Sequence, residues 1–516
     1  MEKLKQVLLE EIPEFKKKGE AFLSGELNKM GFKGVSGGFG VYAHRSGKEF
    51  MIRLRILSGV LSKEQLILVE EFAKRYAVPI IHLTTRQAIQ YHGISLDDVC
   101  HIMQEGLEHN IYTRGAGGNY PRNIAMSPLS GIDGDEVFDV IPYAMAANSY
   151  FLTRINTYRL PRKLKVAFSN SDADTAHATV HDLGFVAKEK EGKPYFEVYI
   201  GGGLGRGPRL GVKLPDLIPA KEAVCVVDAM VALFVAEGDY ENHNKARVRY
   251  IADRMGDEAF IACFMKYLEA SRKKEELYVA EIKPQYCKQG IKKDFAHIAI
   301  KAQKQEGLYS YYFHPIGGQL DQKILHQINE IIAPMEDVSA RLSMGEGIYL
   351  INLNGEEVEK VAKVLDDDNH LVGVSKSRSC IGVPICQMGI LESQKALRQV
   401  IDYFEDKKYT RDTLPPLYIS GCGNSCGVHQ IGGIGLTGKK KKVGDCVKGV
   451  FEVYMGGKCI VGESQLGKFM GDVCEEYVGP CFYELAQKID ESGKDFYQYI
   501  NENEEEVRQI LESYCK

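Results

Sequence analysis

The stretch FMIRLRILSGVLSKEQLILVEEFA, residues 50–73, decides the fold because it occurs twice. It aligns without a gap on YSYYFHPIGGQLDQKILHQINEII, residues 309–332, at a constant shift of 259 positions. In each copy a run of β-forming residues meets a glycine turn, then a helix N-cap residue, Ser62 or Asp321, and then apolar residues at helical spacing. A further strand is expected after each helix, at 80–83 and 348–353. The chain is therefore predicted to contain a duplicated unit of strand, helix and strand.

A second duplicated stretch lies further along the chain at a different shift. FEVYIGG at 196–202 recurs as FEVYMGG at 451–457, and upstream of these 169–185 aligns on 420–436. Between the copies, residues 220–302 alternate apolar and charged positions and are predicted to form a helical connector. A duplicated fold requires no chemistry by itself, so the positions at which the copies differ indicate the function.

Composition limits the classes of function. The chain has 516 residues, with 65 Lys and Arg against 70 Asp and Glu, which gives a formal net charge of −5. This balance argues against general nucleic-acid binding. No apolar run approaches the roughly 18 residues of a membrane-spanning helix, and no signal-peptide pattern opens the sequence. We expect a cytoplasmic protein without nucleic-acid or membrane partners, whose 13 cysteines are thiols or metal ligands rather than disulfides.

Four cysteines form two closely spaced pairs in the second copy only. They are Cys380, Cys386, Cys422 and Cys426. Where the second copy has Cys422 and Cys426, the first has Ser171 and Thr175. Four thiolates suit a zinc ion or a [4Fe-4S] cluster. The spacing of the first pair exceeds that of a zinc knuckle, and Pro384 with its neighbouring glycines favours a loop around a larger object. A cluster is thus the first interpretation, with zinc and unliganded thiols as alternatives.

These cysteines resemble the signature of the sirohaem-dependent nitrite and sulfite reductases. The resemblance includes Asn424 and Gly427 and covers most of the chain, through the motifs TTRQ at 84–87, Arg122 with Asn123, and LPRKLK at 160–165. It implies a sirohaem coupled to a [4Fe-4S] cluster held by the four cysteines, with Cys426 as the shared ligand and Asn424 beside the cofactor. One departure is Gly423, where relatives usually carry proline.

The same resemblance assigns cations of the first copy to the substrate: Arg86, Arg122, Lys163 and Lys165. Fixed positive charge draws a small oxyanion towards an electron-rich centre that would otherwise repel it. We expect Arg86 and Arg122 to bind the anion, and the two lysines to bind it and to deliver protons. The carboxylates of sirohaem need further cations, for which the candidates are Arg53, Arg55, Arg114, Arg162 and Arg206.

Duplication and resemblance together predict an α+β fold with pseudo-twofold symmetry. Ferredoxin-like half-domains would alternate with mixed-sheet sirohaem and cluster domains, with the cofactors between the halves. The predicted segments are an N-terminal helical segment (1–48), two ferredoxin-like half-domains (49–110 and 307–372), a sirohaem and substrate domain (111–215), a helical connector (216–306), a [4Fe-4S] and sirohaem domain (373–482) and a C-terminal helix (483–516).

Three further signals are not interpreted as sites. The run GIGLTG at 433–438 fits a dinucleotide fingerprint, but lysines and a strand-like stretch follow it, so a hairpin is predicted. The lysines at 439–442 could dock an acidic ferredoxin, although a solvated loop is the simpler expectation. His429 is expected to be a buried supporting residue rather than a ligand.

The family resemblance implies a six-electron reduction of sulfite to sulfide or of nitrite to ammonia. Electrons would come singly from a ferredoxin or similar carrier, since no flavin or nicotinamide module is found. Sulfite is favoured because nitrite-specialised members commonly carry Asn where Lys165 stands. The alternative from another class is a non-catalytic electron-transfer or sensor protein, against which the retained cations argue.

Overall fold

The computed structural model describes residues 2–280 and 288–515, so a short part of the predicted connector, 281–287, lies outside the described residues. The chain divides into two compact units. Unit 1 comprises residues 1–203, 209–312 and 320–367, and unit 2 comprises 204–208, 313–319 and 368–516. No helix among the described residues is long and apolar enough to cross a membrane.

Two five-stranded sheets of unit 1 exchange a strand with each other. Their strand orders are β1-β2-β5-β4-β14 and β12-β13-β16-β15-β3. Strand β3 belongs to the first repeat, yet its Leu61 lies opposite Ala340 of β15, while β14 of the second repeat completes the first sheet. The strands are β1 Val41–Ala43, β2 Phe50–Leu54, β3 Val60–Leu61, β4 Ile80–Leu83, β5 Ile89–Ile94, β12 Ile300–Ala302, β13 Leu308–Phe313, β14 Gln319–Asp321, β15 Ser339–Leu342 and β16 Ile348–Asn354.

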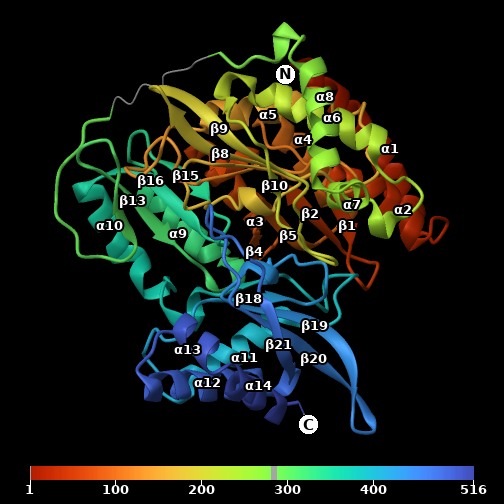
Figure 1. Ribbon diagram of the computed structural model, residues 1–516. Coiled ribbons are helices and arrows are strands. Elements are labelled where there is room, and N and C mark those ends of the chain that lie inside the picture. Colours follow the sequence, from red (N-terminus) through yellow and green to blue (C-terminus); the bar gives the residue numbers. More distant parts are fainter. Residues whose placement is uncertain (1, 281–287, 516) are drawn as a thin grey trace. The chain divides into compact units, whose positions relative to one another are not determined.

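Helices α3 (Lys63–Arg75) and α9 (Gln322–Ile332) are the repeated helices, and they begin where the sequence predicts. Ser62 caps α3 through a capping box with Gln65, and the Asp321 side chain accepts the Lys323 N–H. The two helices pack together, with the Asn329 amide donating to the Glu70 carboxylate at 2.8 Å. In Figure 1, α9 and α10 (Gly355–Leu365) lie over the sheet that contains β13, β15 and β16.

One predicted equivalence between the repeats is wrong. The strand at 348–353 was matched to β4, but the two strand orders pair β4 with β15 and β5 with β16. The 259-residue shift therefore continues through both strands, from Ile80 to Ser339 and from Ile89 to Ile348. The sequence hid this because β15 carries Ser and Arg on its alternating positions and has a weak apolar pattern.

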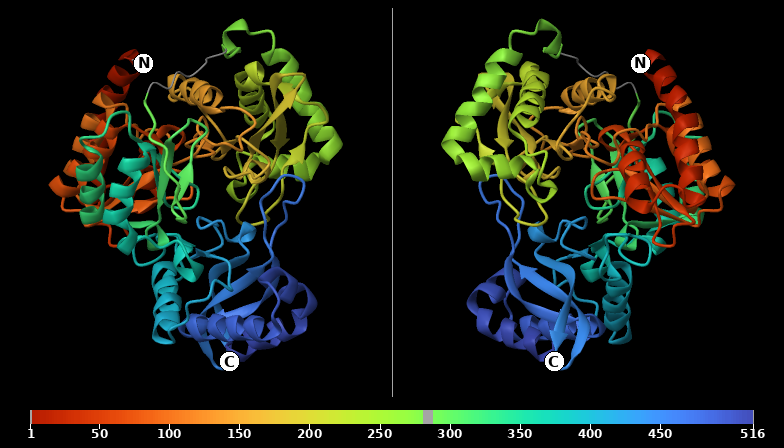
Figure 2. Two further views of the ribbon diagram at one scale, coloured as in Figure 1. Left: turned by 90° about the vertical axis from the view of Figure 1, so that its left-hand side faces the viewer. Right: turned by 90° about the vertical axis from the view of Figure 1, so that its right-hand side faces the viewer.

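The third sheet of unit 1 is the larger mixed sheet of the first copy, with the order β10-β9-β8-β7-β6. Phe168 and Phe185 stack at 4.2 Å between ring centroids in its core, and Phe196 packs edge-on against both. Figure 2 shows the yellow-green helices α6 and α8 alongside this yellow sheet. Its strands are β6 Ala125–Met126, β7 Val166–Ser169, β8 Leu183–Lys190, β9 Lys193–Ile200, β10 Val212–Lys213 and β11 Ile218–Pro219. The helices of this half are α1 Glu2–Leu23, α2 Lys29–Ser36, α4 Leu96–Glu108, α5 Ile141–Thr153, α6 Ala223–Glu237, α7 Val248–Met255 and α8 Asp257–Ser271.

Unit 2 contains the corresponding sheet of the second copy, with the order β17-β18-β19-β20-β21. Its pairings repeat those of β6 to β9, two parallel and then one antiparallel. The predicted hairpin is confirmed, because β19 and β20 pair antiparallel and the run 433–438 leads into and forms the start of β19. The elements are β17 Arg378–Ser379, β18 Leu417–Ser420, β19 Ile434–Val443, β20 Cys446–Met455, β21 Lys468–Cys474, α11 Ser393–Asp406, α12 Val478–Ser492, α13 Phe496–Glu502 and α14 Glu504–Ser513. The observed architecture is the predicted α+β fold with an internal duplication.

Candidate active site

The loop that carries Cys422 and Cys426 follows strand β18 in unit 2. Ser425, between the two cysteines, has a φ of 53°, which turns the chain sharply directly before Cys426. The Ser420 hydroxyl, at the end of β18, accepts the Gly427 N–H at 3.1 Å. The loop is thus anchored on both sides of the cysteine pair.

Cys380 follows the neighbouring parallel strand, β17, and lies against the start of the same loop. Its N–H donates to the Ile419 carbonyl at 3.1 Å, and the Gly421 N–H donates to its Sγ at 3.1 Å. Ser393 Oγ lies 3.3 Å from the same sulfur. Hydrogen bonds to sulfur stabilise the thiolate, which is the form that binds metals.

The four cysteines of the two pairs, all in unit 2, lie close enough to influence one another's pKa values. Burial, followed by the charge of Cys426, raises the pKa of Cys380 to about 12. Burial also raises the pKa of Cys422, with contributions from Cys426 and Cys386. Within residues 2–280 and 288–515, no three His, Cys, Asp or Glu side chains converge closely enough for a single metal ion. The sulfurs therefore gather in one region without meeting at one point.

The first copy builds the same loop without sulfur. The residues equivalent to the four cysteines, matched by strand register and backbone hydrogen bonds, are Ser127, Asp133, Ser171 and Thr175. Ser127 Oγ and Thr175 Oγ1 are 2.6 Å apart and hydrogen-bonded, where the second copy has Cys380 and Cys426. The first copy thus has a direct hydroxyl–hydroxyl contact at the position where the second copy has two thiols.

A short segment from the first copy, 204–208, belongs to unit 2 and lies against the cysteine loop. Gln430 donates to the Gly205 carbonyl at 2.9 Å and accepts the Gly205 N–H at 3.1 Å. A Cβ on Gly423 would lie 3.8 Å from Arg206 Cγ, so the arginine side chain passes over the loop between Cys422 and Cys426. The predicted Arg206 is therefore beside the predicted ligands.

Arg86 lies in the turn between β4 and β5 in unit 1. The next residue, Gln87, has a φ of 52° and is fully buried, and its side-chain amide donates to two backbone carbonyls. The Arg86 guanidinium contacts His181 Nε2 and the Asn123 carbonyl, while the Asn123 amide donates back to the Arg86 carbonyl at 3.1 Å. The turn and its cation are thus fixed to the segments around 123 and 181.

Arg122 and the two predicted lysines lie on paired segments of unit 1. The Arg122 N–H donates to the Leu164 carbonyl at 2.9 Å, which places Lys163 and Lys165, the residues on either side of Leu164, next to Arg122. The Arg122 guanidinium donates to two backbone carbonyls at 2.8 and 2.9 Å. The structure thus brings Arg86, Arg122, Lys163 and Lys165 together in one unit.

The cations of this group depress one another's pKa values. Burial, together with the charges of Arg86, Lys163 and Arg247, lowers the pKa of Lys165 well below its usual range. Burial and the charge of Arg122 lower the pKa of Arg86 to about 9. Positive charge is therefore concentrated at a buried site. The charged form of each side chain is disfavoured there until an anion is present.

Asp182 offsets part of this charge but is already committed to another arginine. Its carboxylate accepts hydrogen bonds from Arg247 at 2.7 and 2.8 Å, and both side chains are buried. It also accepts the Lys165 N–H at 2.8 Å. This pair fixes the backbone of Lys165, and Asp182 acts electrostatically on both Arg86 and Lys165.

The other predicted arginines of unit 1 are held by protein groups. Arg53 donates to the Ala116 carbonyl at 2.8 Å, and the fully buried Arg55 donates to two carbonyls of 121–122. Arg114 pairs with Glu11 at 3.0 Å, and Arg162 contacts Asn119 at 3.3 Å. Their assignment to a cofactor stays a prediction, as does that of Asn424.

Sequence reasoning missed His181, Asp182 and Arg247. His181 and Asp182 stand directly before the apolar strand β8, and a buried charge at the start of such a strand is the signal that could have found them. Arg247 lies in the predicted connector, where KARVRY alternates charged and apolar residues and was interpreted only as part of a helical segment. Both arginines are in fact buried.

The remaining signals lie in unit 2. His429 is buried and its Nδ1 contacts Ser420 Oγ at 3.0 Å, which agrees with a supporting role. Of the lysines at 439–442, Lys439 pairs with Glu452 and Asp472, and Lys441 pairs with Asp472. These two lysines are thus partly neutralised along the hairpin.

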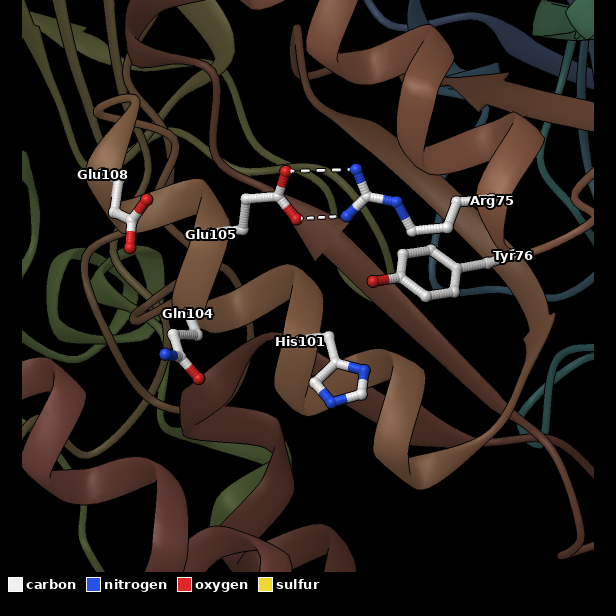
Figure 3. Close-up of a pocket in the computed structure, with 6 residues that line it drawn as sticks. All are labelled: Arg75, Tyr76, His101, Gln104, Glu105 and Glu108. Atoms are coloured by element: carbon white, nitrogen blue, oxygen red, sulfur yellow. Dashed lines mark hydrogen bonds and ion pairs between the residues drawn. The ribbon is translucent and has the colours of Figure 1, made fainter.

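A separate hollow of about 430 Å³ lies between the end of α3 and helix α4 (Figure 3). It is lined by Arg75, Tyr76, His101, Gln104, Glu105 and Glu108. Arg75 and Glu105 face each other as an ion pair in this view. None of the residues predicted from the sequence lines this hollow.

Two models of known protein-family domains match parts of the chain. The model of the Nitrite/Sulfite reductase ferredoxin-like half domain matches residues 42–109, and that of the Nitrite and sulphite reductase 4Fe-4S domain matches 117–272. The second match falls on the copy that lacks the four cysteines, as expected if the two copies share one ancestral fold.

Similar proteins align over most of the chain. A ferredoxin–nitrite reductase of Synechococcus elongatus is 28% identical over 83% of this chain and 84% of its own length. A ferredoxin sulfite reductase of Mycolicibacterium paratuberculosis is 26% identical over 86% of this chain and 83% of its own. The solved structure of the Mycobacterium tuberculosis NirA protein matches with a TM-score of 0.82 at 22% identity, over 98% of this chain and 97% of that one, and supports the fold. Over most of its length the chain is thus similar to nitrite and sulfite reductases, and two domain models of that family match residues 42–109 and 117–272.

Proposed function

We propose that the protein catalyses the six-electron reduction of a small oxyanion, sulfite to sulfide in preference to nitrite to ammonia. The observation that carries this proposal is the buried cation group Arg86, Arg122, Lys163 and Lys165. Asp182, the carboxylate that acts on both Arg86 and Lys165, is paired with Arg247. Buried positive charges are stable only when an anion binds beside them.

The residues of unit 2 fit a [4Fe-4S] cluster. The donor set is all thiol, the four cysteines are grouped without converging on one ion, and Gly421 already donates to one sulfur. Cys380, Cys386, Cys422 and Cys426 would hold the cluster, and Arg206 beside them would offset negative charge of the cofactors. A sirohaem coupled to this cluster would supply electrons to the bound anion.

The chain's own residues would bind the anion and supply protons. Arg86 and Arg122 remain charged and hold oxygen atoms through their guanidinium groups. Each oxygen that leaves as water takes two protons, which Lys163 and Lys165 would deliver. The pKa of Lys165 is low because of burial and cationic neighbours, so an arriving anion raises it and lets the amine take up a proton for transfer.

The preference for sulfite rests on Lys165. An ammonium at this position favours an oxyanion with more negative charge and more oxygens to protonate, whereas nitrite-specialised relatives commonly have Asn there. Similar proteins include both a nitrite reductase and a sulfite reductase, so activity on the two anions has to be compared directly. The electron donor is proposed to be a ferredoxin or a similar one-electron carrier, in keeping with the names of these relatives.

The first test replaces Lys165 with Asn. We expect kcat/KM for sulfite to fall about 10-fold more than that for nitrite, as loss of roughly one charge-assisted contact requires. Lys188→Asn is the matched control, because Lys188 lies on the same sheet and pairs with Asp172 at 2.6 Å on the surface. An equal loss on both anions would remove the ground for preferring sulfite.

A second test separates the enzyme from a non-catalytic electron-transfer protein. The visible spectrum of the purified protein is recorded before and after addition of sulfite or nitrite. Bands that shift with either anion support the reductase, whereas a cluster spectrum insensitive to both supports the electron-transfer alternative. A colourless protein containing zinc would overturn both.

A further inference from the structure

We propose that His181 is a positioning residue that holds the Arg86 guanidinium in its anion-binding orientation; the proposal rests on the proposed function. His181 lies directly before strand β8 and is 5% exposed. One of its ring nitrogens, Nε2, contacts an Arg86 Nη atom, and the other, Nδ1, contacts the His177 carbonyl.

These two contacts define the tautomer of His181. A carbonyl oxygen only accepts hydrogen bonds, so Nδ1 must carry the proton and donate to His177. Nε2 is then left with its lone pair, and it accepts an N–H from Arg86. The imidazole thus bridges the His177 backbone carbonyl and the Arg86 guanidinium.

The surroundings keep this tautomer neutral. Burial and the charges of Arg86 and Lys165 lower the pKa of His181 well below its ordinary value. His177 lowers the pKa further through its side chain, while the bond to its carbonyl acts in the opposite direction. Asp182, the adjacent carboxylate, is held by Arg247. Protonated His181 would point an N–H at a cation, so the Arg86 contact requires the neutral ring.

The duplication provides an independent reason to treat the two residues as a pair. The turn that holds Arg86 recurs in the second copy with the same backbone bonds, and the equivalent of Arg86 is Gly345. The residue equivalent to His181 is Gly432, because the carbonyls of Asp182 and Gly433 each accept the N–H of the glycine that follows the second strand of the hairpin, β9 or β20. The first copy thus has both side chains and the second copy has neither, as expected if Arg86 and His181 act as a pair.

Two variants of His181 separate positioning from proton transfer. His181→Gln retains a neutral acceptor but cannot carry a proton, whereas His181→Leu removes the acceptor. We expect His181→Leu to raise the sulfite dissociation constant, measured by titration calorimetry on the holoenzyme, roughly 10-fold. KM should rise in parallel with kcat changed less than about 3-fold, and His181→Gln should stay within about 3-fold of the wild type in both quantities.

A double-mutant cycle with Arg86→Ala shows whether His181 acts through Arg86. If it does, His181→Leu weakens sulfite binding no further in the Arg86→Ala background. His44→Leu is the matched control for loss of a buried imidazole, since His44 is 7% exposed in the same unit and lies beside Glu49. It should leave sulfite affinity unchanged, and the unfolding midpoint of every variant is compared with the wild type.

Several results would overturn the proposal. Equal losses from His181→Leu with and without Arg86 would show that His181 does not act through the arginine. A collapse of kcat in His181→Gln with unchanged affinity would identify a proton carrier instead. If the wild-type holoenzyme binds neither sulfite nor nitrite, the proposed function fails and this inference fails with it, a result distinct from the first two.

Discussion

The loops that follow β7 and β18 have a similar backbone turn but carry different side chains. In the first copy Asp174, with a φ of 46°, collects hydrogen bonds that close the loop on itself. In the second copy the equivalent Ser425 has a φ of 53°, and the loop carries Cys422 and Cys426 instead. A backbone that needs no particular side chain for its turn is free to hold either an internal polar network or metal ligands.

The glycines beneath these loops show why the backbone is the same. A Cβ on Gly184 would lie 2.0 Å from the Ala178 carbonyl oxygen, and one on Gly435 would lie 1.8 Å from that of His429. Each strand thus passes directly under its loop, and only glycine permits this approach. The two copies therefore share a geometric constraint while their chemistry diverges.

The largest expected effect concerns the ligands themselves. Cys422→Ser should lose the iron and the visible absorption of the purified protein, because serine is a poor ligand for a cluster. Ser171→Ala, at the equivalent position of the first copy, should retain the full iron content of the wild type. Iron content per chain is measured for both variants. A Cys422→Ser protein with wild-type iron would remove this cysteine from the ligand set.

A smaller effect is expected from exchanging the residues that close the turns. Asp174→Ser gives the first copy the residue of the second, and it removes a buried carboxylate that accepts from Ser169, Ala178 and Thr179. We expect the free energy of unfolding to fall by about 2–4 kcal/mol, since buried donors lose their acceptor. Urea denaturation gives this value.

The control for that exchange is Asp172→Ser, two positions away. Asp172 is exposed and pairs with Lys188, and a surface pair of this kind contributes about 1 kcal/mol or less. If Asp174→Ser costs no more than Asp172→Ser, the carboxylate does not hold the loop of the first copy.

The smallest effect is a dependence on pH confined to the first copy. The pKa of His181 is lowered in the folded protein, so below about pH 6.5 the unfolded chain binds a proton that the folded protein does not. The wild type should therefore lose about 1 kcal/mol of unfolding free energy between pH 7 and pH 5.5 relative to His181→Gln. Parallel stability curves for the two proteins over this range would show that His181 is protonated in the folded state.

The local features of the fold could be predicted from the sequence, but few of its long-range contacts could. Ser62 and Asp321 were recognisable as N-caps because capping depends on residues only a few positions apart. The exchange of β3 and β14 was not, because these strands span two and three residues and their partners lie far away in the sequence. The equivalence of β4 and β15 was lost for a related reason, since a short strand with polar positions leaves a weak pattern.

The candidate site shows the same limit. The cysteine pairs and the cations were found from spacing and resemblance, and the structure gathers each group within its own unit. His181 and Asp182 were not found because they contact Arg86 and Lys165, and Arg247 was not found because it pairs with Asp182; no local pattern records these contacts. The finer domain boundaries and the individual cofactor contacts stay predictions.

The exchanged strands have a consequence for biosynthesis. While the polypeptide leaves the ribosome, the first ferredoxin-like sheet cannot gain its outer strand until residues 319–321 have been made. Until then the edge of β4 offers unpaired backbone groups to any other nascent chain nearby. Synthesis of the two halves as separate polypeptides would make this exposure permanent, so a split version of the gene should yield aggregated first halves unless both fragments are produced together.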